Sequence, residues 1–375
     1  MTKEKSLQGI EKKLGSDSIP IVFSTDRNYY LYLGVALKSL ANNRNNAKYD
    51  VIVLMTDLNQ YEKERLESLS CDGLSIRVYN IKKYVDRYKV GQYTTLNHIK
   101  ESAYYRLLIA EILQNYDKII YLDCDLIILT DLTELYQIDL RDKYAAVVQD
   151  LLIANIFRKG RDFVKYMNDT LSIKDLNFYF NSGVMVFNLD LMRETNIQSR
   201  LLEVASVNNR YFHDQNVLNS VFYQKVVYLD EAYNVNYHLQ FDRHRELFPD
   251  TVWKKYLIDV DRPLILHYSS GFKPWNNPDL PKADIWWKYA RLTPLYEDIL
   301  YNNLKNKANK EQESKEIDKS LIKDIINYNK IYFSYCRYKV LSKITFGKRR
   351  ERYKQKKLEL RLRLRNVRYF RKYCL

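Results

Sequence analysis

Two carboxylates at the end of a predicted buried strand are the residues of this sequence best placed to do chemistry. The stretch 118–131 reads KIIYLDCDLIILTD, and Asp123 and Asp125 interrupt its apolar run with only Cys124 between them. Residues i and i+2 of a strand point to the same side, so two carboxylates converge there and repel each other unless a cation lies between them. Oxygen ligands favour a hard ion such as Mn²⁺ or Mg²⁺, which leaves coordination positions for substrate phosphates. The pattern predicts a metal–diphosphate site, with a strand-end Asp that caps the next turn as the alternative.

The segments before this stretch predict the sheet that positions the acid pair. Three β-prone apolar runs, at 19–25, 49–55 and 74–79, alternate with two helical patterns, at 30–40 and 60–69. This order implies a mostly parallel sheet, in which ligands bind beyond the carboxyl ends of the strands. Asp26 and Asn28 follow the first run, where a carboxylate and an amide are able to hold a uracil or a ribose. An Asx turn that enters the helix explains both residues equally well.

The segment between the third strand and the acid pair predicts a flap and a helix. Residues 85–98 have no clear periodicity, and we expect a mobile flap there. Residues 101–113 carry an apolar stripe at helical spacing and predict a helix. Arg106 lies off that stripe, which is typical of a solvated position. A further strand at 144–148 ends close to Asp150.

Two later segments combine apolar runs with polar residues suited to a sugar. In 178–189, FYFNSGVMVFNL, the residues Asn181, Ser182 and Gly183 interrupt a strand, which permits a close backbone approach or a bulge. A buried Asn needs hydrogen-bond partners, and sugar hydroxyls would supply them. Residues 212–216, FHDQN, head a helix. Their short polar side chains are either caps or groups that orient hydroxyl protons.

The segment 263–275, PLILHYSSGFKPW, predicts a buried strand that delivers His267, then a turn, then Lys273. A neutral imidazole is able to act as a third metal ligand, and turn amides with a lysine are able to bind phosphate. A structural histidine is the alternative for His267 taken alone. The acid pair elsewhere in the sequence favours the metal ligand.

The length of the chain leaves room for one large domain and an accessory part. The chain has 375 residues, enough for one α/β domain and an extension. No apolar run approaches the roughly 20 residues that span a bilayer, and the first residues have no apolar segment typical of a secretory signal. The four cysteines lie far apart, which argues against a disulfide framework or a zinc knuckle. We expect a cytoplasmic protein.

The basic excess lies at one end of the chain. Lys and Arg number 61 and Asp and Glu 46, a net charge of +15. Residues 330–375 hold 17 of the bases and two of the acids, so residues 1–329 hold 44 of each. The segment 306–319 is charged and poor in apolar residues, and from 339 onward basic residues alternate with Leu, Tyr and Phe. Such an extension suits an anionic membrane surface, with a solvated tail as one alternative and nucleic-acid binding as another.

Six ordered motifs resemble a known family. FSTDRNY, AYYRL, YLDCD, FNSGVMVFNL, HDQN and HYSSGFKPW together resemble family 8 retaining glycosyltransferases. They are most similar to the bacterial lipooligosaccharide galactosyltransferase branch, with glycogenin a more distant relative. The resemblance covers about residues 19–290. It implies the GT-A fold, an α/β architecture with a Rossmann-like mixed sheet flanked by helices. It divides the chain into an N-terminal tail at 1–18, the GT-A domain at 19–300, and a charged linker with a basic, mainly helical extension at 301–375.

The resemblance also assigns roles to residues. It implies that Asp123, Asp125 and His267 bind Mn²⁺, with Mg²⁺ as an alternative ion. Gln215 and Asp214 take the catalytic positions, and Asp150 that of an acceptor-side acid. The implied donor-binding residues are Ser24, Thr25, Asp26, Asn28, Tyr29, Arg106, Asp123, Cys124, Asp125, Asn181, Ser182, Asp214, Gln215, His267, Ser270, Gly271 and Lys273.

Two positions depart from the pattern of the family. Asn216 replaces a second Asp of the galactosyltransferase branch, which leaves the donor sugar open between galactose and glucose. Ser270 stands where a glycine is expected, and Gly271 follows one residue later.

The function that the resemblance implies is transfer of galactose or glucose from a UDP-sugar to a hydroxyl of a bacterial surface glycan or glycoprotein, with an alpha linkage. We expect the enzyme at the inner face of the membrane, as a peripheral protein. One alternative is a glycogenin-like initiator that glycosylates itself. The other is a nucleic-acid-binding protein that uses the basic extension, which is disfavoured because residues 1–329 are electrically balanced.

Overall fold

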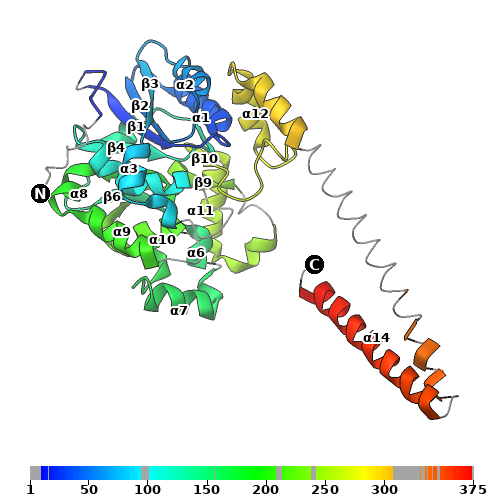
Figure 1. The fold of residues 1–375 in the computed structure, drawn as a ribbon. Coiled ribbons are helices and arrows are strands. Elements are labelled where there is room, and N and C mark those ends of the chain that lie inside the picture. Colours follow the sequence, from blue (N-terminus) through cyan, green and yellow to red (C-terminus); the bar gives the residue numbers. More distant parts are fainter. Residues whose placement is uncertain are drawn as a thin grey trace, which may run out of the picture. The chain divides into compact units, whose positions relative to one another are not determined.

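The computed structural model describes most of the chain and divides it into two compact units, Met1–Ile299 and Leu300–Leu375 (Figure 1). In the first unit the described residues are 10–15, 17–93, 101–155, 157–207, 213–237 and 242–299. In the second they are 300–306, 330, 334–335, 337–339, 341–343 and 347–373. The first unit ends one residue before the boundary predicted at 300.

A seven-stranded mixed sheet organises the first unit. In spatial order its strands are β3 (Leu74–Asn80), β2 (Tyr49–Met55), β1 (Ile19–Ser24), β4 (Lys118–Leu122), β7 (Phe180–Asn188), β6 (Ala145–Gln149) and β8 (Val226–Tyr228). Strands β3, β2, β1 and β4 are parallel, as the sequence pattern predicted. Strand β7 is antiparallel to both of its neighbours, whereas β8 is parallel to β6. The mixed GT-A sheet implied by the resemblance is therefore confirmed.

Helices cover both faces of this sheet (Figure 1). The described helices of the first unit are α1 (Tyr30–Asn43), α2 (Gln60–Glu67), α3 (Lys82–Arg87), α4 (Ile109–Ile112), α5 (Thr133–Gln137), α6 (Leu151–Asn155), α7 (Arg161–Asp169), α8 (Leu189–Glu194), α9 (Ile197–Val207), α10 (His213–Val221), α11 (Asp250–Asp261) and α12 (Ala283–Arg291). Short 3₁₀ helices lie at Val90–Tyr93, Glu101–Leu108, Phe157–Lys159, Leu176–Phe178, Glu231–Asn234 and Asp242–Leu247.

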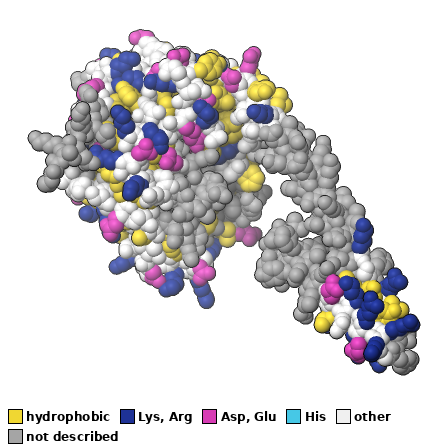
Figure 2. Space-filling view, viewed as in Figure 1, with side chains coloured by type: hydrophobic (Ala, Val, Ile, Leu, Met, Phe, Trp, Pro, Cys, Tyr) yellow, Lys and Arg dark blue, Asp and Glu magenta, His cyan; other side chains and the backbone are white. Residues whose placement is uncertain are grey.

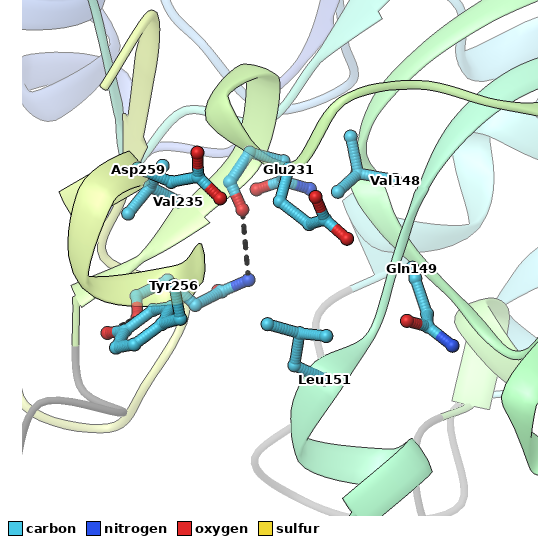
Figure 3. Close-up of a pocket in the computed structure, with 9 residues that line it drawn as sticks. Val148, Gln149, Leu151, Glu231, Val235, Tyr256 and Asp259 are labelled. Atoms are coloured by element: carbon cyan, nitrogen blue, oxygen red, sulfur yellow. Dashed lines mark hydrogen bonds between the residues drawn. The ribbon is translucent and has the colours of Figure 1, made fainter. Parts of the chain in front are cut away.

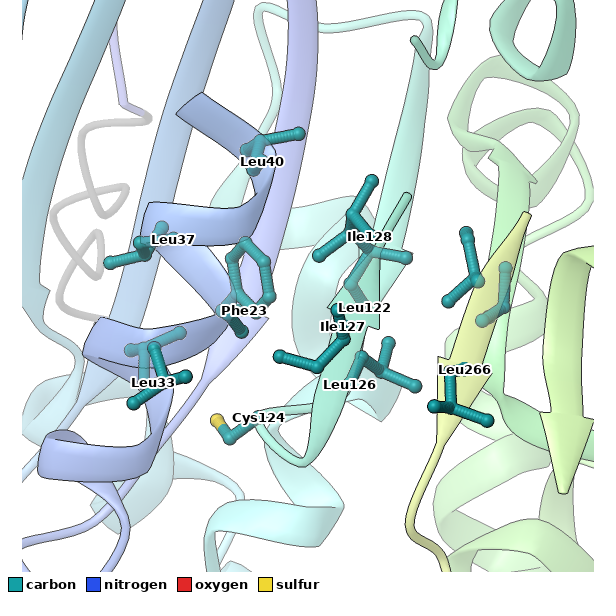
Figure 4. Close-up of a cluster of buried hydrophobic side chains, with 14 of the residues drawn as sticks. Phe23, Leu33, Leu37, Leu40, Leu122, Cys124, Leu126, Ile127, Ile128 and Leu266 are labelled. Atoms are coloured by element: carbon teal, nitrogen blue, oxygen red, sulfur yellow. The ribbon is translucent and has the colours of Figure 1, made fainter. Parts of the chain in front are cut away.

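The two-residue period of the strands builds a separate core on each face. On β4, Ile120 and Leu122 join the core that α1 and α12 cover, whereas Ile119 and Tyr121 join the core on the opposite face. Figure 4 shows Leu33 and Leu37 of α1 packed near Phe23 and Leu122 in the first core. Because β4 is buried on both faces, its carboxyl end is held firmly, and the acid pair follows directly.

A second, three-stranded sheet begins just after the acid pair. It consists of β5 (Leu126–Ile128), β10 (Ile265–His267) and β9 (Val235–Asn236), with β10 in the centre. Strand β10 is antiparallel to β5, and this register places His267 opposite Leu126. The chain therefore leaves one sheet and enters the other across Asp123–Asp125. Main-chain pairing in the second sheet brings a residue from far downstream next to Asp125.

Two predictions for the segment before β4 need correction. The helix predicted at 101–113 is a 3₁₀ helix from Glu101 to Leu108 and becomes α-helical at Ile109. Part of the predicted flap at 85–98 is regular, since α3 extends to Arg87 and a 3₁₀ turn covers Val90–Tyr93. Residues 94–98 of that flap lie outside the described residues.

Part of the predicted N-terminal tail packs against the first unit. Ile10 is buried, and its amide donates to the Ile112 carbonyl at 3.2 Å. The Glu11 carbonyl accepts from Arg77 Nη1 at 2.8 Å. Arg77 is also bound to the buried Asp50 carboxylate of β2. This buried pair ties residues 10–13 to the amino end of the sheet, away from the acid pair.

The second unit contains the basic helix α14 (Gly347–Tyr373). The preceding segment packs on it, through a ring contact of Tyr338 with Tyr353 at 5.8 Å and a hydrogen bond from Arg350 Nε to the Ser342 carbonyl. Figure 2 shows Lys and Arg crowded over the described residues of this unit. Leu360 is 6% exposed, whereas Leu358, two residues away, is 57% exposed. These two leucines therefore lie on different sides of the helix. Among the helices the structure describes, none is long and apolar enough to cross a membrane.

Candidate functional site

Asp123, Asp125 and His267 converge where the two sheets meet. His267 Nε2 lies 3.2 Å from Asp125 Oδ1 and 4.0 Å from Asp123 Oδ2. One ligand atom from each of the three residues lies within 4.8 Å of the others. Two carboxylate oxygens and an imidazole nitrogen are a donor set that suits Mn²⁺ or Mg²⁺. The predicted grouping of the strand-end acids with the distant histidine is confirmed.

Each carboxylate of this cluster uses one oxygen for a cationic side chain and directs the other towards the histidine. Asp123 Oδ1 accepts from Arg106 Nη2 at 2.7 Å. Asp125 Oδ2 pairs with Lys273 Nζ, which also donates to the Tyr268 carbonyl. Burial raises the pKa of Asp125, but the charge of Lys273 outweighs it, and the pKa lies well below its usual range. Both carboxylates are thus oriented by protein cations before any ion binds.

Arg106 was expected at a solvated position, and that prediction is wrong. Its side chain is 5% exposed. Its Nε lies 3.2 Å from Asp214 Oδ2, Nη1 donates to the Ser182 carbonyl at 2.7 Å, and the guanidinium lies 4.4 Å from the ring centroid of Tyr121. The segment is a 3₁₀ helix whose residues from Tyr104 to Leu108 are all buried, so a stripe calculated for an α-helix gave the wrong side. Arg106 links three predicted site residues that are far apart in sequence.

Asp214 lies at the start of α10, as predicted, and its side chain is largely buried. Burial raises the pKa of Asp214 to about 6, although the charge of Arg106 opposes the shift. Phe212, the first residue of the predicted helix start, lies outside the described residues, and α10 begins at His213. His213 has a positive φ of 40°, an uncommon conformation for a residue with a side chain.

The absence of a side chain at Gly183 leaves room for the His267 ring beside β7. A Cβ at this position would lie 2.3 Å from His267 Cε1 and 3.0 Å from Asp123 Oδ2. The Gly183 carbonyl also accepts from the Asp123 amide at 2.9 Å. Pairing of β6 with β7 shifts register between Val147 and Val148. The close approach and the bulge expected from the Asn-Ser-Gly interruption are therefore both present.

The Gln215 side chain is held at both ends. Its Oε1 accepts from the Ser182 amide at 3.0 Å, and its Nε2 donates to Asp150 Oδ2 at 3.1 Å. Because a backbone N–H can only donate, the Ser182 contact fixes which end of the amide is the oxygen. Asp150 also accepts from the Ile153 amide at 3.0 Å, and burial raises the pKa of its carboxyl. The predicted catalytic and acceptor-side residues are thus direct neighbours.

Asp26 forms the Asx turn that the sequence offered as one of two roles, and it keeps one carboxylate oxygen free of that turn. Its Oδ1 accepts from the amides of Asn28 at 2.7 Å and Tyr29 at 3.2 Å, which is an Asx turn into α1. Its Oδ2 is buried and accepts no hydrogen bond from any residue that the structure describes. The ring of Tyr29 packs edge-on against Trp275, with centroids 5.9 Å apart. A buried carboxylate oxygen without a donor needs a partner, which a ligand N–H would supply.

The remaining predicted donor-binding residues lie around this cluster in different environments. Cys124 is buried in the first core, and its Sγ lies 3.0 Å from the Ser24 carbonyl. Thr25 is buried, and its Oγ1 donates to the Asp26 carbonyl at 3.3 Å. Ser270 Oγ accepts from the Phe272 amide in the turn after β10. An added Cβ at Gly271 would meet no atom within 4 Å. Packing therefore does not require a glycine at position 271.

Sequence reasoning missed Asn234. This residue is 3% exposed and lies between His267 and Asn181, with its Oδ1 2.8 Å from His267 Nδ1. Its Nδ2 donates to Asn181 Oδ1 at 2.8 Å. The surrounding sequence, EAYNVNYH, offers little signal, because a short polar residue before a two-residue strand is typical of a turn.

A second group of acids does not form a comparable site. Asp230, Glu231 and Asp259 converge, but Lys255 Nζ pairs with all three of them. Two of these acids, Glu231 and Asp259, line a small pocket. In Figure 3 this pocket lies between Gln149 and Leu151 on one side and Val235 and Tyr256 on the other. Its residues Gln149 and Leu151 flank Asp150 in the sequence.

Comparison with known proteins shows the family to which the domain with this site is similar. Residues 20–279 match the family model described as glycosyl transferase family 8. General stress protein A of Bacillus subtilis is 27% identical, over 73% of this chain and 93% of that protein. A lipopolysaccharide 1,2-glucosyltransferase of Escherichia coli is 25% identical, over 82% of this chain and 86% of that protein.

Solved structures share the fold. The bifunctional glycosyltransferase WbbM in its apo form has a TM-score of 0.70 at 26% identity, over 80% of this chain and 54% of that one. This chain thus spans about half of that protein. The galactosyltransferase LgtC, crystallised with donor and acceptor sugar analogues, has a TM-score of 0.59 at 24% identity, over 74% of this chain and 96% of that one. The folds of both are those of GT-A glycosyltransferases.

Substitution of Gly183 tests the packing of the metal-ligand cluster. We expect Gly183→Ala to displace His267, because the added Cβ would lie 2.3 Å from its ring, and to weaken Mn²⁺ binding by about tenfold or more. Electron paramagnetic resonance of Mn²⁺ titrated into the donor-free protein measures the change. Gly160→Ala is the control, since its Cβ would meet only ordinary contacts of 3.4 Å and more. Equal Mn²⁺ affinity of Gly183→Ala and the wild type would contradict this account of the site.

Proposed function

The chain belongs to glycosyl transferase family 8, and from that premise we propose that it is a Mn²⁺-dependent retaining hexosyltransferase. Its donor is UDP-galactose or UDP-glucose, and its acceptor is a hydroxyl of a bacterial surface glycan or glycoprotein, joined by an alpha linkage. The observation that carries the proposal is the convergence of Asp123, Asp125 and His267 between two cationic side chains. The name of the Escherichia coli relative supports a hexose and a surface-glycan acceptor.

The ligand cluster fits a divalent ion, which when bound would supply Lewis-acid stabilisation of the leaving diphosphate. Asp123 Oδ2, Asp125 Oδ1 and His267 Nε2 would hold it, because Arg106 and Lys273 already occupy the other carboxylate oxygens. Lys273 also places a positive charge beside the cluster, where negative charge grows on the departing group.

The side chain of Gln215 favours attack by the acceptor on the same face from which the diphosphate leaves. The sugar passes through an oxocarbenium-like state. An enzyme nucleophile on the opposite face needs an available electron pair, whereas the Gln215 oxygen accepts from Ser182 and its nitrogen donates to Asp150. In the proposed step the anomeric C–O bond to phosphate breaks, the bond to the acceptor oxygen forms, and the leaving phosphate takes the hydroxyl proton.

Asp26 supports uridine as the nucleotide. Its buried Oδ2 can only accept a hydrogen bond while the carboxyl is ionised. Uracil has an N–H at ring position 3, whereas cytosine has a lone pair there. Asn28 and Tyr29, which follow Asp26 in the Asx turn, are the other residues proposed to hold the nucleoside, with the ring of Tyr29 beside the base.

The acceptor is proposed to bind beside Asp150, whose neighbours line the pocket of Figure 3. Asn216, at the position that leaves the donor sugar open, is fully buried, and its Oδ1 accepts from the Tyr179 hydroxyl at 2.7 Å. The Tyr179 hydroxyl lies 3.4 Å from Gln215 Nε2, so one proposed route by which Asn216 affects the choice between galactose and glucose is through Tyr179 and Gln215.

The basic extension is proposed to hold the enzyme at the inner face of the membrane, in the cytoplasm. The charge of the extension supports this proposal, since residues 330–375 carry 17 basic and two acidic residues. Each base near an anionic surface contributes on the order of 1 kcal/mol. Leu358 of α14 is exposed and Leu360 is buried, and attraction by charge is the main proposed contribution.

A panel of UDP-sugars tests the proposed reaction. We expect the full chain with Mn²⁺ to hydrolyse UDP-galactose or UDP-glucose slowly, and to lose this activity with a chelator or with Asp125→Ala. Asp230→Ala, which removes an exposed carboxylate of the second acidic group, serves as the control and retains activity. Turnover of no UDP-sugar would overturn the proposal. An increase in the intact mass of the enzyme by whole hexose units would instead favour self-glycosylation.

The base preference tests the role of Asp26. We expect Asp26→Asn to keep the Asx turn through its amide oxygen but to present an N–H to the base. The Kd for UDP should rise about tenfold or more, which is about 1.4 kcal/mol, and the Kd for CDP should fall. Calorimetric titration with both nucleotides and Mn²⁺ measures this. An unchanged ratio of the two Kd values would show that Asp26 does not read the base.

Truncation after Asn329 tests the role of the extension. We expect the full chain to sediment with phosphatidylserine vesicles at low salt and to be released at high salt, whereas the truncated chain stays in solution. Activity on a soluble acceptor should stay within about twofold, because the metal-ligand cluster lies in the other compact unit. Binding of the full chain to purely zwitterionic vesicles, or loss of all activity on truncation, would contradict the proposed role.

A further inference from the structure

We propose that Asn234 is a positioning residue that keeps the proton of neutral His267 on Nδ1 and so presents the Nε2 lone pair to the metal ion. The proposal rests on the proposed function, since it concerns the ion that this function requires. Its basis is a chain of buried amides that begins at a backbone N–H and ends at the imidazole ring.

The chain is anchored at Gly183. Its amide donates to Asn181 Oδ1 at 2.9 Å. A backbone N–H cannot act as an acceptor, so this contact fixes the Asn181 side chain with its oxygen towards Gly183. Asn181 therefore has a single orientation in this network.

The orientation of Asn181 fixes that of Asn234. Asn181 Oδ1 lies 2.8 Å from Asn234 Nδ2, which must be the donor because the partner is an oxygen without a proton. Asn234 Oδ1 is then directed at His267 Nδ1, at 2.8 Å. An amide oxygen is only an acceptor, so His267 Nδ1 carries the proton in this contact. Exchange of the two amide ends of Asn234 would place two oxygens together at the Asn181 contact.

The consequence for the site follows from the two nitrogens of the ring. In the neutral imidazole only one nitrogen has a proton, so Nε2 presents a lone pair. This lone pair faces Asp125 Oδ1 at 3.2 Å and Asp123 Oδ2 at 4.0 Å. Three electron-rich atoms then face one another, an arrangement that a bound cation relieves. With the opposite tautomer, Nε2–H would donate to Asp125 and obstruct the ion.

Burial makes Asn234 difficult to replace by water. Asn234 is 3% exposed, His267 2% and Asn181 7%. A buried polar atom that loses its partner costs about 1–3 kcal/mol, and loss of the hydrogen-bond partner of a ligand histidine typically weakens metal binding by about 10–100-fold. The chain also joins His267 to the backbone of β7 at Gly183 through Asn181.

Mn²⁺ affinity and the tautomer of His267 together test the proposal in the full chain without donor. We expect Asn234→Leu, which keeps the size but removes both hydrogen bonds, to weaken Mn²⁺ binding by about 10–100-fold. Nitrogen-15 spectra of the metal-free protein, at a pH where the imidazole is neutral, should show the proton on Nδ1 in the wild type and a mixture of tautomers in the variant. Asn234→Asp retains an acceptor for Nδ1 and should recover most of the affinity.

Asn43→Leu is the matched control. The Asn43 side chain also bridges separate elements, since it donates to the Ser39 and Ile128 carbonyls and to the Tyr289 hydroxyl. Its loss should lower the stability of the fold while Mn²⁺ affinity and the His267 tautomer stay as in the wild type. A decrease of Mn²⁺ affinity in both variants would indicate a general effect of destabilisation and contradict a specific role of Asn234.

The outcomes separate this inference from the proposed function. A wild type that does not bind Mn²⁺ contradicts the proposed function. A wild type that binds Mn²⁺ but has the neutral His267 proton on Nε2 contradicts the inference alone, and this measurement needs no variant. Equal Mn²⁺ affinity and an unchanged tautomer in Asn234→Leu contradict it as well.

Discussion

Mutual repulsion between the carboxylates of Asp123 and Asp125 is the constraint on which the rest of the site depends. The fold reduces it by giving each acid its own cation, Arg106 for Asp123 and Lys273 for Asp125. These pairs leave one oxygen of each acid beside His267. Burial of the charged groups would be costly without such partners. The arrangement keeps both acids oriented in the absence of substrate.

The geometry of the site follows from the change of sheet at Asp123–Asp125. Strand β4 is buried on both faces, and β5 pairs with β10 so that His267 lies opposite Leu126. Strand β7 runs alongside β4, and the absence of a side chain at Gly183 leaves room for the imidazole. Backbone pairing therefore sets the positions of all three ligands, which suits a site that has to hold an ion at defined distances.

The sequence predicted the site best where reactive side chains lie at the ends of apolar strand-like runs. Asp123, Asp125 and His267 each follow or end an apolar run, which marked them as candidate metal ligands, and the family resemblance implied that they act together. The position of Arg106 could not be predicted, because the 3₁₀ geometry of Glu101–Leu108 is decided by tertiary packing rather than by local sequence. Asn234 carries no periodic signal at all. Its importance becomes visible only from the contacts that it makes with Asn181 and His267.

Anomalous diffraction from crystals grown with Mn²⁺ and UDP tests the central claim most directly. The account predicts one strong manganese peak about 2.0–2.3 Å from Asp123 Oδ2, Asp125 Oδ1 and His267 Nε2, with diphosphate oxygens in the remaining coordination positions. A manganese peak elsewhere, or UDP bound with the two acids paired only to Arg106 and Lys273, would contradict it.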